Sequence, residues 1–147
     1  MRRAICSLNF MYGMERFATE IYRAQRSAFG ETGIAEKLKH ATENEQQHAE
    51  SLRNRIVDLE GNPSRFSVLF LIAGRLLGHI TRCFGKKLML RADILIEKRA
   101  VRDYGYFLGT MHFGEDTNPL IRSIISDEEQ HVQNWGKALS LLKGTAE

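Results

Sequence analysis

The chain has 147 residues, of which 43% are hydrophobic and 27% charged, with only two prolines. This composition is typical of one globular domain over residues 1–147 and not of a disordered or fibrous chain. The net charge is +3, from 21 Lys and Arg against 18 Asp and Glu, so no nucleic-acid partner is expected. The two cysteines, Cys6 and Cys83, form no CxxC pair, which excludes a rubredoxin-type module, a zinc ribbon or a disulfide framework and fits a reducing compartment.

Glycine and proline interrupt the sequence rarely, and the segments between them predict helices. In chain order these segments are 4–29, 34–60, a shorter apolar one at 65–83, 86–112 and 119–143. Asn62 before Pro63 and Asn118 before Pro119 each place a favourable N-cap residue ahead of a proline that suits the first helical turn. No segment alternates with period two, so strands are not expected.

The longest apolar stretch runs from Val68 to Gly74, far short of the ~20 residues that span a bilayer. No charged and apolar leader opens the chain. We therefore expect a cytoplasmic protein, either soluble or peripheral at the inner face of the membrane.

Each of the four long segments has one stripe, at spacings of three and four, that would face the other helices of a bundle. Every stripe is apolar except near its middle, where it carries one carboxylate: Glu15, Glu45, Glu97 or Glu128. Two segments add a histidine three positions later, at His48 and His131, and this spacing puts both side chains on one face. One ExxH pair alone is a weak signal. Four inward carboxylates, however, need positive charge between them, because burying an unpaired one costs several kcal/mol.

Two divalent metal ions would supply that charge. Oxygen-rich ligation with two imidazoles suits iron, or manganese as the alternative, better than zinc. Glu15 precedes the first ExxH by 30 residues and Glu97 precedes the second by 31, so the two halves repeat one pattern. This is the known arrangement of ferritin-like di-iron proteins. The sequence thus predicts an all-α, ferritin-like four-helix bundle with an extra short amphipathic helix between core helices two and three.

Glu20 competes with Glu15 for the ligand position in the first helix. Its helical neighbours include Arg16 and Arg23, which indicate a solvated ion-pair face. Glu15 instead has apolar neighbours along its stripe, so we expect Glu15 to be the ligand.

Imidazole ligands usually donate their second N–H to another group. Asn44 and Asp127 directly precede the glutamates of the two ExxH pairs. Our hypothesis is that Asp127 orients His48 across the bundle and that Asn44 orients His131.

Tyr22 and Tyr104 each follow a stripe glutamate by seven positions, or two helical turns. They are either core aromatics with a bonded hydroxyl or phenols that act beside the metals, in redox chemistry or in positioning the substrate. Tyr104 is the candidate catalytic residue.

The run from Glu15 to Gln25 resembles the demethoxyubiquinone hydroxylases, in which a ligand Glu is followed by Ala, Ile-Tyr and Gln. Residues 73–85 are similar to that family's AGxxLGxxTxxxG stretch, and residues 127–131 to its DExxH. The likeness covers about residues 9–135. The next most similar family is rubrerythrin, which lacks the glycine-rich stretch.

The resemblance implies a di-iron oxidase or monooxygenase that activates dioxygen and hydroxylates the ring of a quinone-like precursor in ubiquinone biosynthesis. The implied metal ligands are Glu15, Glu45, His48, Glu97, Glu128 and His131. The chain has no GxGxxG or CxxC motif, so a separate electron donor is expected. The alternatives are a rubrerythrin-like peroxidase acting on hydrogen peroxide, and a ferroxidase or iron-binding protein, each without a rubredoxin module.

In the hydroxylase family the glycine-rich region is associated with membrane contact. This chain departs from the family by carrying Arg75, His79 and Arg82 on one face there, and Asp103 where the hydroxylases tend to have His. The resemblance implies that the basic stripe lies at anionic headgroups while apolar side chains enter the bilayer. These side chains are Phe66, Leu69, Phe70 and Leu76. We also expect the chain to form a homo-oligomer, as a dimer. The alternative to membrane contact is an ordinary amphipathic helix that covers the bundle or forms a contact in that homodimer.

The four expected ligand carboxylates change the meaning of the net charge. Without them, 14 acids face 21 bases, and the exterior carries +7. An anionic membrane surface or an acidic redox partner fits such an exterior better than the bare composition indicates.

Overall fold

A computed structural model describes residues 2–30 and 32–144. The elements are α1 (Arg2–Arg26), the short 3-10 helix η1 (Ser27–Phe29), α2 (Gly33–Asp58), α3 (Ser67–Cys83), α4 (Lys86–Thr110) and α5 (Thr117–Gly144). No strand occurs in these two ranges. The expected all-α fold is confirmed, and so is the short helix between core helices two and three.

The two helix starts that were predicted from the Asn-Pro pairs differ in the structure. α3 begins at Ser67, several residues after Pro63, because Asn9 of α1 holds the segment between them. The Asn9 amide donates to the Asn62 carbonyl at 3.2 Å, and its Oδ1 accepts from the Ser64 N–H at 2.5 Å. α5 begins two residues earlier than predicted.

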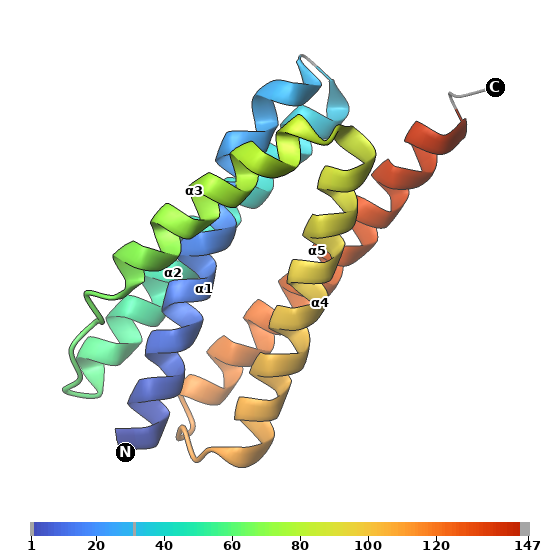
Figure 1. Cartoon of the computed structure of the whole chain (residues 1–147). Coiled ribbons are helices and arrows are strands. Elements are labelled where there is room, and N and C mark those ends of the chain that lie inside the picture. The colour runs from blue at the N-terminus through green and yellow to red at the C-terminus, as the bar shows by residue number, and fades with distance from the viewer. Residues whose placement is uncertain (1, 31, 145–147) are drawn as a thin grey trace.

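The helices pack as two units. α1 lies along both α2 and α3, whereas α4 lies along α5. Figure 1 shows the α4–α5 pair standing beside the three helices of the N-terminal unit. The four long helices form the bundle, and α3 covers the outer side of α1.

α3 packs on α1 at very short range. A Cβ on Gly74 would lie 2.2 Å from the Phe17 carbonyl oxygen, and one on Gly78 would lie 2.9 Å from the Ile21 carbonyl oxygen. Only glycine permits this approach of two helix backbones. α3 therefore places its glycines against α1 and turns large apolar side chains outward.

The core of the bundle consists of two apolar clusters. One includes Tyr22 and Trp135, and the other includes Met11 and Leu52. On each of the four long helices, the residues between the two clusters include buried charged or polar side chains. The fold thus holds a polar layer across the middle of an apolar core.

Candidate metal centre

Six residues singled out in the sequence form the polar layer. They are Glu15 on α1, Glu45 and His48 on α2, Glu97 on α4, and Glu128 and His131 on α5. The carboxylates are 1–2% exposed, and the two histidines are 6% and 8% exposed. All six therefore face the interior of the bundle.

The ligand-type atoms of these residues gather in two groups that could each hold a metal ion. The groups are Glu15, Glu45, His48 and Glu128, and Glu45, Glu97, Glu128 and His131. Within each group these atoms all lie within 4.8 Å of one another. Glu45 and Glu128 belong to both groups, so their carboxylates are placed to bridge two ions.

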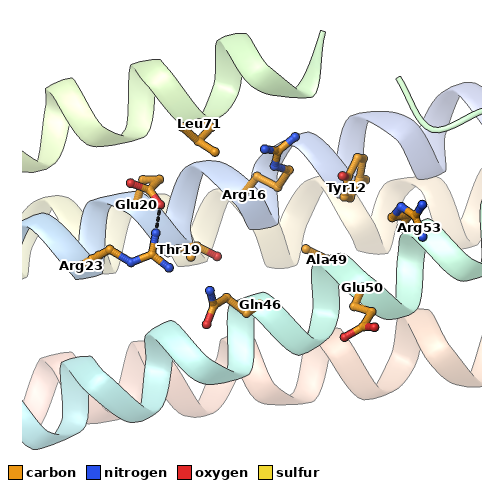
Figure 2. Close-up of a pocket in the computed structure, with 10 residues that line it drawn as sticks. All are labelled: Tyr12, Arg16, Thr19, Glu20, Arg23, Gln46, Ala49, Glu50, Arg53 and Leu71. Atoms are coloured by element: carbon orange, nitrogen blue, oxygen red, sulfur yellow. Dashed lines mark hydrogen bonds and ion pairs between the residues drawn. The ribbon is translucent and has the colours of Figure 1, made fainter. Parts of the chain in front are cut away.

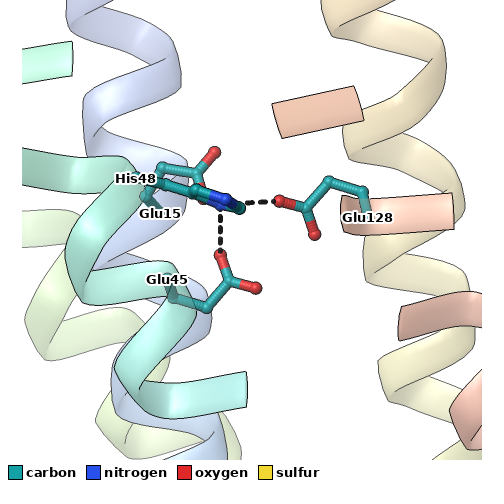
Figure 3. Close-up of side chains that lie close together, drawn as sticks. All are labelled: Glu15, Glu45, His48 and Glu128. Carbon is teal, nitrogen blue, oxygen red and sulfur yellow. Dashed lines mark ion pairs between the residues drawn. The ribbon is translucent and has the colours of Figure 1, made fainter. Parts of the chain in front are cut away.

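The carboxylates converge on the inner nitrogen of each histidine. Nδ1 of His48 lies 3.2 Å from Glu128 Oε1, 3.4 Å from Glu15 Oε2 and 3.9 Å from Glu45 Oε2. Figure 3 shows this group, with the His48 ring between carboxylates that come from three helices. In the second group, three carboxylate oxygens lie 3.0–3.4 Å from Nδ1 of His131.

The crowding of carboxylates shifts the proton equilibria of the layer. Burial, together with the charges of Glu128 and Glu15, raises the pKa of Glu45 well above its usual value. Burial lowers the pKa of His48, but its hydrogen bonds to Glu128 and Glu15 outweigh that effect and raise the pKa to about 11. The layer therefore binds positive charge strongly.

Three atoms show that the layer suits metal ions. Glu45 Oε1, Glu128 Oε1 and His48 Nδ1 are fully buried, and apart from the imidazole–carboxylate contacts given above they have no hydrogen-bond partner among the described residues. Buried polar atoms without a partner are destabilising and uncommon in folded proteins. A donor set of carboxylates and imidazoles, without thiolates, is the type that iron and manganese take. The donors and their charge thus fit two divalent ions.

Two tyrosines each donate a hydrogen bond to a glutamate across the α1–α4 interface. The Tyr104 hydroxyl of α4 donates to Glu15 Oε1 of α1 at 2.5 Å, and the Tyr22 hydroxyl of α1 donates to Glu97 of α4. The Trp135 indole N–H donates in turn to the Tyr22 hydroxyl at 3.1 Å. Burial and the charge of Glu15 raise the pKa of Tyr104 well above its usual value, so the phenol keeps its proton for this bond.

The hypothesis about the outer nitrogens of the histidines is half correct. Nε2 of His48 donates to Asp127 Oδ2 at 3.0 Å across the bundle, which confirms the contact predicted for Asp127. No hydrogen bond joins Asn44 to His131 within the described residues, so that half of the hypothesis is wrong. Asn44 and His131 both line a cavity between α2 and α5.

Glu20 lies outside both groups, but the expectation that it is solvated is wrong. It is 6% exposed and pairs with Arg23. Figure 2 shows this pair in the wall of a surface cavity of about 620 Å³ bounded by α1, α2 and α3, with Leu71 of α3 near Glu20. The Arg23 guanidinium supplies the positive charge that Glu20 needs, so this carboxylate is satisfied without a metal ion.

A small chamber of about 10 Å³ adjoins the centre. It is bounded by the four inner carboxylates and Tyr104, and its apolar wall is formed by Met14, Ala18, Ile96 and Ala100. These apolar residues belong to α1 and α4. The chamber therefore lies on the α1–α4 side of the layer, away from the histidines of α2 and α5.

Sequence reasoning missed a further buried polar group at the α1–α3–α4 junction. Gln25 Nε2 donates to Asp93 Oδ1 at 2.9 Å and to Thr81 Oγ1 at 3.0 Å. Burial raises the pKa of Asp93 to about 8. Asp93 lies one turn before Glu97, and this spacing is the signal that could have found it.

Comparison with known proteins adds a family assignment. A model of the family described as ubiquinone biosynthesis protein COQ7 matches residues 13–138. The match runs from α1 into α5 and includes all six residues of the two groups. No curated protein matches the chain.

Proposed function

The chain belongs to the ubiquinone biosynthesis protein COQ7 family, a ferritin-like di-iron family, and on that premise we propose that it hydroxylates the ring of a quinone precursor at a di-iron carboxylate centre. Family membership supports an oxidoreductase of ubiquinone biosynthesis. The observation that carries the finer proposal is the pair of buried ligand groups that share Glu45 and Glu128.

In this proposal each group of four residues would hold one iron ion, with manganese as the alternative, and Glu45 and Glu128 would serve both groups. The bound ions would supply the redox chemistry that activates dioxygen. The protein contributes the geometry. Its helices fix the carboxylates and both imidazoles in one buried layer, and the apolar clusters above and below that layer exclude water.

Tyr104 is the residue that we assign to act beside the ions. Its hydroxyl donates to Glu15, and its side chain lies in the chamber wall. It therefore holds Glu15 in one orientation and offers a neutral phenol to a molecule in the chamber. Tyr22, held between Trp135 and Glu97, serves as a positioning residue.

The apolar chamber wall favours substrate approach from the α1–α4 side. A volume of about 10 Å³ holds about one water-sized molecule, so groups between α1 and α4 must move before a ring can bind. Ala18 and Ala100 in this wall have small side chains, so an entering ring would have few atoms to displace there.

The same small volume favours a second candidate, a rubrerythrin-like peroxidase. Hydrogen peroxide needs much less room beside the centre than a quinone ring does. The two candidates therefore differ in how far the bundle must open for turnover.

We also propose that α3 contacts a membrane surface. Its outer side exposes large apolar side chains, which are Phe66, Val68, Leu69, Ile72, Leu76 and Ile80. Arg75, His79 and Arg82 are exposed beside them, as the headgroup hypothesis requires. Phe70, which was also expected to enter the bilayer, is not among these exposed side chains: it is half-buried and packs edge-on against Phe10, with ring centroids 6.1 Å apart, so we leave it out of the proposed contact.

No helix in the described part of the chain is both long and apolar enough to cross a membrane.

Vesicle binding tests the membrane proposal. Vesicles rich in anionic lipid should bind the protein at low salt, and the Arg75→Glu, Arg82→Glu double variant should lose this binding. The absence of binding by the unchanged protein would contradict the proposal. If the protein instead forms a dimer that Leu69→Glu dissociates, the exposed side of α3 is a homodimer contact.

The hydroxylase proposal requires reducing equivalents from a separate donor. The protein should be loaded anaerobically with ferrous iron, reduced chemically, and mixed with a quinone precursor and isotope-labelled dioxygen. Mass spectrometry should find the label in the product. Rapid peroxide consumption without labelled product would instead support the peroxidase, and iron oxidation without either would support a ferroxidase.

A further inference from the structure

The six residues of the centre are nearly closed off from solvent, so a metal ion needs a path to reach them. Along the bundle axis the layer is bounded by the two apolar clusters. Toward α1 and α4 it is bounded by the apolar chamber wall. An ion that crossed any of these regions would lose its water ligands without replacement, which is strongly unfavourable.

The side between α2 and α5 is different. A cavity of about 350 Å³ lies there, and its wall includes the amides of Asn44, Gln130 and Asn134, the carboxylate of Asp127, and His131. Gln130 is exposed, and the Asp127 side chain is 46% exposed, so this cavity reaches the surface. Polar side chains therefore extend from solvent to a residue of the centre.

The two histidines of the centre differ in how they are held. The outer nitrogen of His48 is fixed by Asp127 at 3.0 Å. No hydrogen bond from the described residues reaches Nε2 of His131, although this ring lies in the cavity wall. The His131 ring can therefore turn toward the cavity without breaking a hydrogen bond at Nε2, whereas the His48 ring would lose its bond to Asp127.

We propose that hydrated divalent metal ions reach the centre through the α2–α5 cavity and that His131 is the first residue of the centre to bind them. The inference rests on the proposed function in one respect, which is that the two ligand groups bind metal. It adds the route, the order of ligation and a role for the missing contact between Asn44 and His131.

The charges around the cavity agree with a cationic ligand. Asp127 lies in its wall, and His40, also in the wall, lies 3.4 Å from Glu36 and 3.7 Å from Glu43. Three carboxylates therefore stand at or beside the opening. Among the described residues Lys37 is the ammonium in the wall, and Lys39, outside the wall, lies 3.7 Å from Glu36. Both side chains are exposed enough to turn into solvent.

The rate of metal binding tests the route. Apoprotein is mixed with Co²⁺, whose visible absorption changes when nitrogen and oxygen ligands replace water. Gln130→Phe places a large apolar group in the cavity wall, and Gln133→Phe makes the same change at an exposed position of α5 outside the cavity. We expect Gln130→Phe to slow the binding of Co²⁺ by up to about tenfold. Gln133→Phe should bind Co²⁺ at the unchanged rate. The final metal content should be equal in all proteins.

Other results would overturn the inference. Equal binding rates in both variants, or equal slowing in both, would show that the cavity is not the route. If no protein binds metal even after long incubation, the metal centre itself fails, and with it the proposed function. Asn134→Leu provides a second change in the wall, and circular dichroism checks that each variant is folded. A normal rate in both Asn134→Leu and Gln130→Phe would place the route elsewhere.

Discussion

Tyr104 on α4 donates its hydroxyl hydrogen to Glu15 on α1, and Tyr22 on α1 returns an equivalent contact to Glu97 on α4. Each half of the internal repeat thus supplies a phenol to the glutamate of the other half. These two glutamates are the ones that belong to only one ligand group each. The exchange therefore fixes the unshared carboxylates, and losing one phenol should affect one group more than the other.

Replacing Tyr104 with Phe tests this asymmetry. The change removes the donor from Glu15, and lost contacts of this kind weaken metal binding by about 10- to 100-fold. A metal titration should show the loss in one of two binding steps. Tyr106→Phe is the matched control because Tyr106 lies on the same helix and is 64% exposed. Equal weakening of both steps would contradict the assignment of Glu15 to one group.

Removing a shared carboxylate should have a different effect from removing an unshared one. Glu45 lies in both ligand groups, whereas Glu15 lies in one. Elemental analysis should therefore find about two iron or manganese ions in the unchanged chain, fewer in Glu15→Ala, and fewest in Glu45→Ala. If Glu45→Ala retains as much metal as the unchanged chain, the bridging role is wrong.

The close contact of α3 with α1 predicts a strong effect at Gly74. A methyl group there meets the Phe17 carbonyl oxygen, so Gly74→Ala should lower the free energy of unfolding by about 1–3 kcal/mol. Gly105→Ala is the control because Gly105 also lies within a helix, in the last third of α4, and nothing lies within 4 Å of a Cβ built there. Helix propensity should make this second change stabilising by about 1 kcal/mol. Urea unfolding measures both changes, and similar results for the two would contradict the close packing.

Asp93 should make stability depend on pH. Burial raises its pKa from 3.8 to about 8, so the folded chain keeps a proton that the unfolded chain releases. The resulting stabilisation is present below about pH 4 and is lost as pH rises toward about 8. Asp93→Asn should remove this loss while keeping an oxygen for Gln25. Urea unfolding at about pH 5 and about pH 9 measures the difference, and equal pH dependence in both proteins would argue against a buried carboxyl.

Most of the helices could be predicted from the sequence, because the spacing of apolar residues along each segment agrees with the face that the helix buries. Glu45 and His48 share a helix face wherever that helix lies, and an inward carboxylate is visible as a break in an apolar stripe. The start of α3 could not be predicted, since it depends on Asn9, more than fifty residues earlier in the chain, bonding to the segment after Asn62.

Contacts between helices were also harder to predict than positions along them. The repeat treats Asn44 and Asp127 alike, yet only Asp127 reaches a histidine. Similarly, the neighbours of Glu20 along α1 indicate a solvated face, but α3 covers that face and Arg23 compensates the charge. Both outcomes depend on how helices pack, which heptad spacing alone does not encode.

The packing of the helices in two units also bears on how the polypeptide stays together. Each ligand group draws residues from both units, because Glu45 of α2 and Glu128 of α5 occur in both groups. Gly85, with a φ of 89°, links the units at the turn between α3 and α4. If the chain were severed at this turn, the two fragments would share every metal site, and the free energy of ligation would become an affinity between them. Metal ligation would then hold the two fragments together, and the concentration of the metal ion would control their assembly.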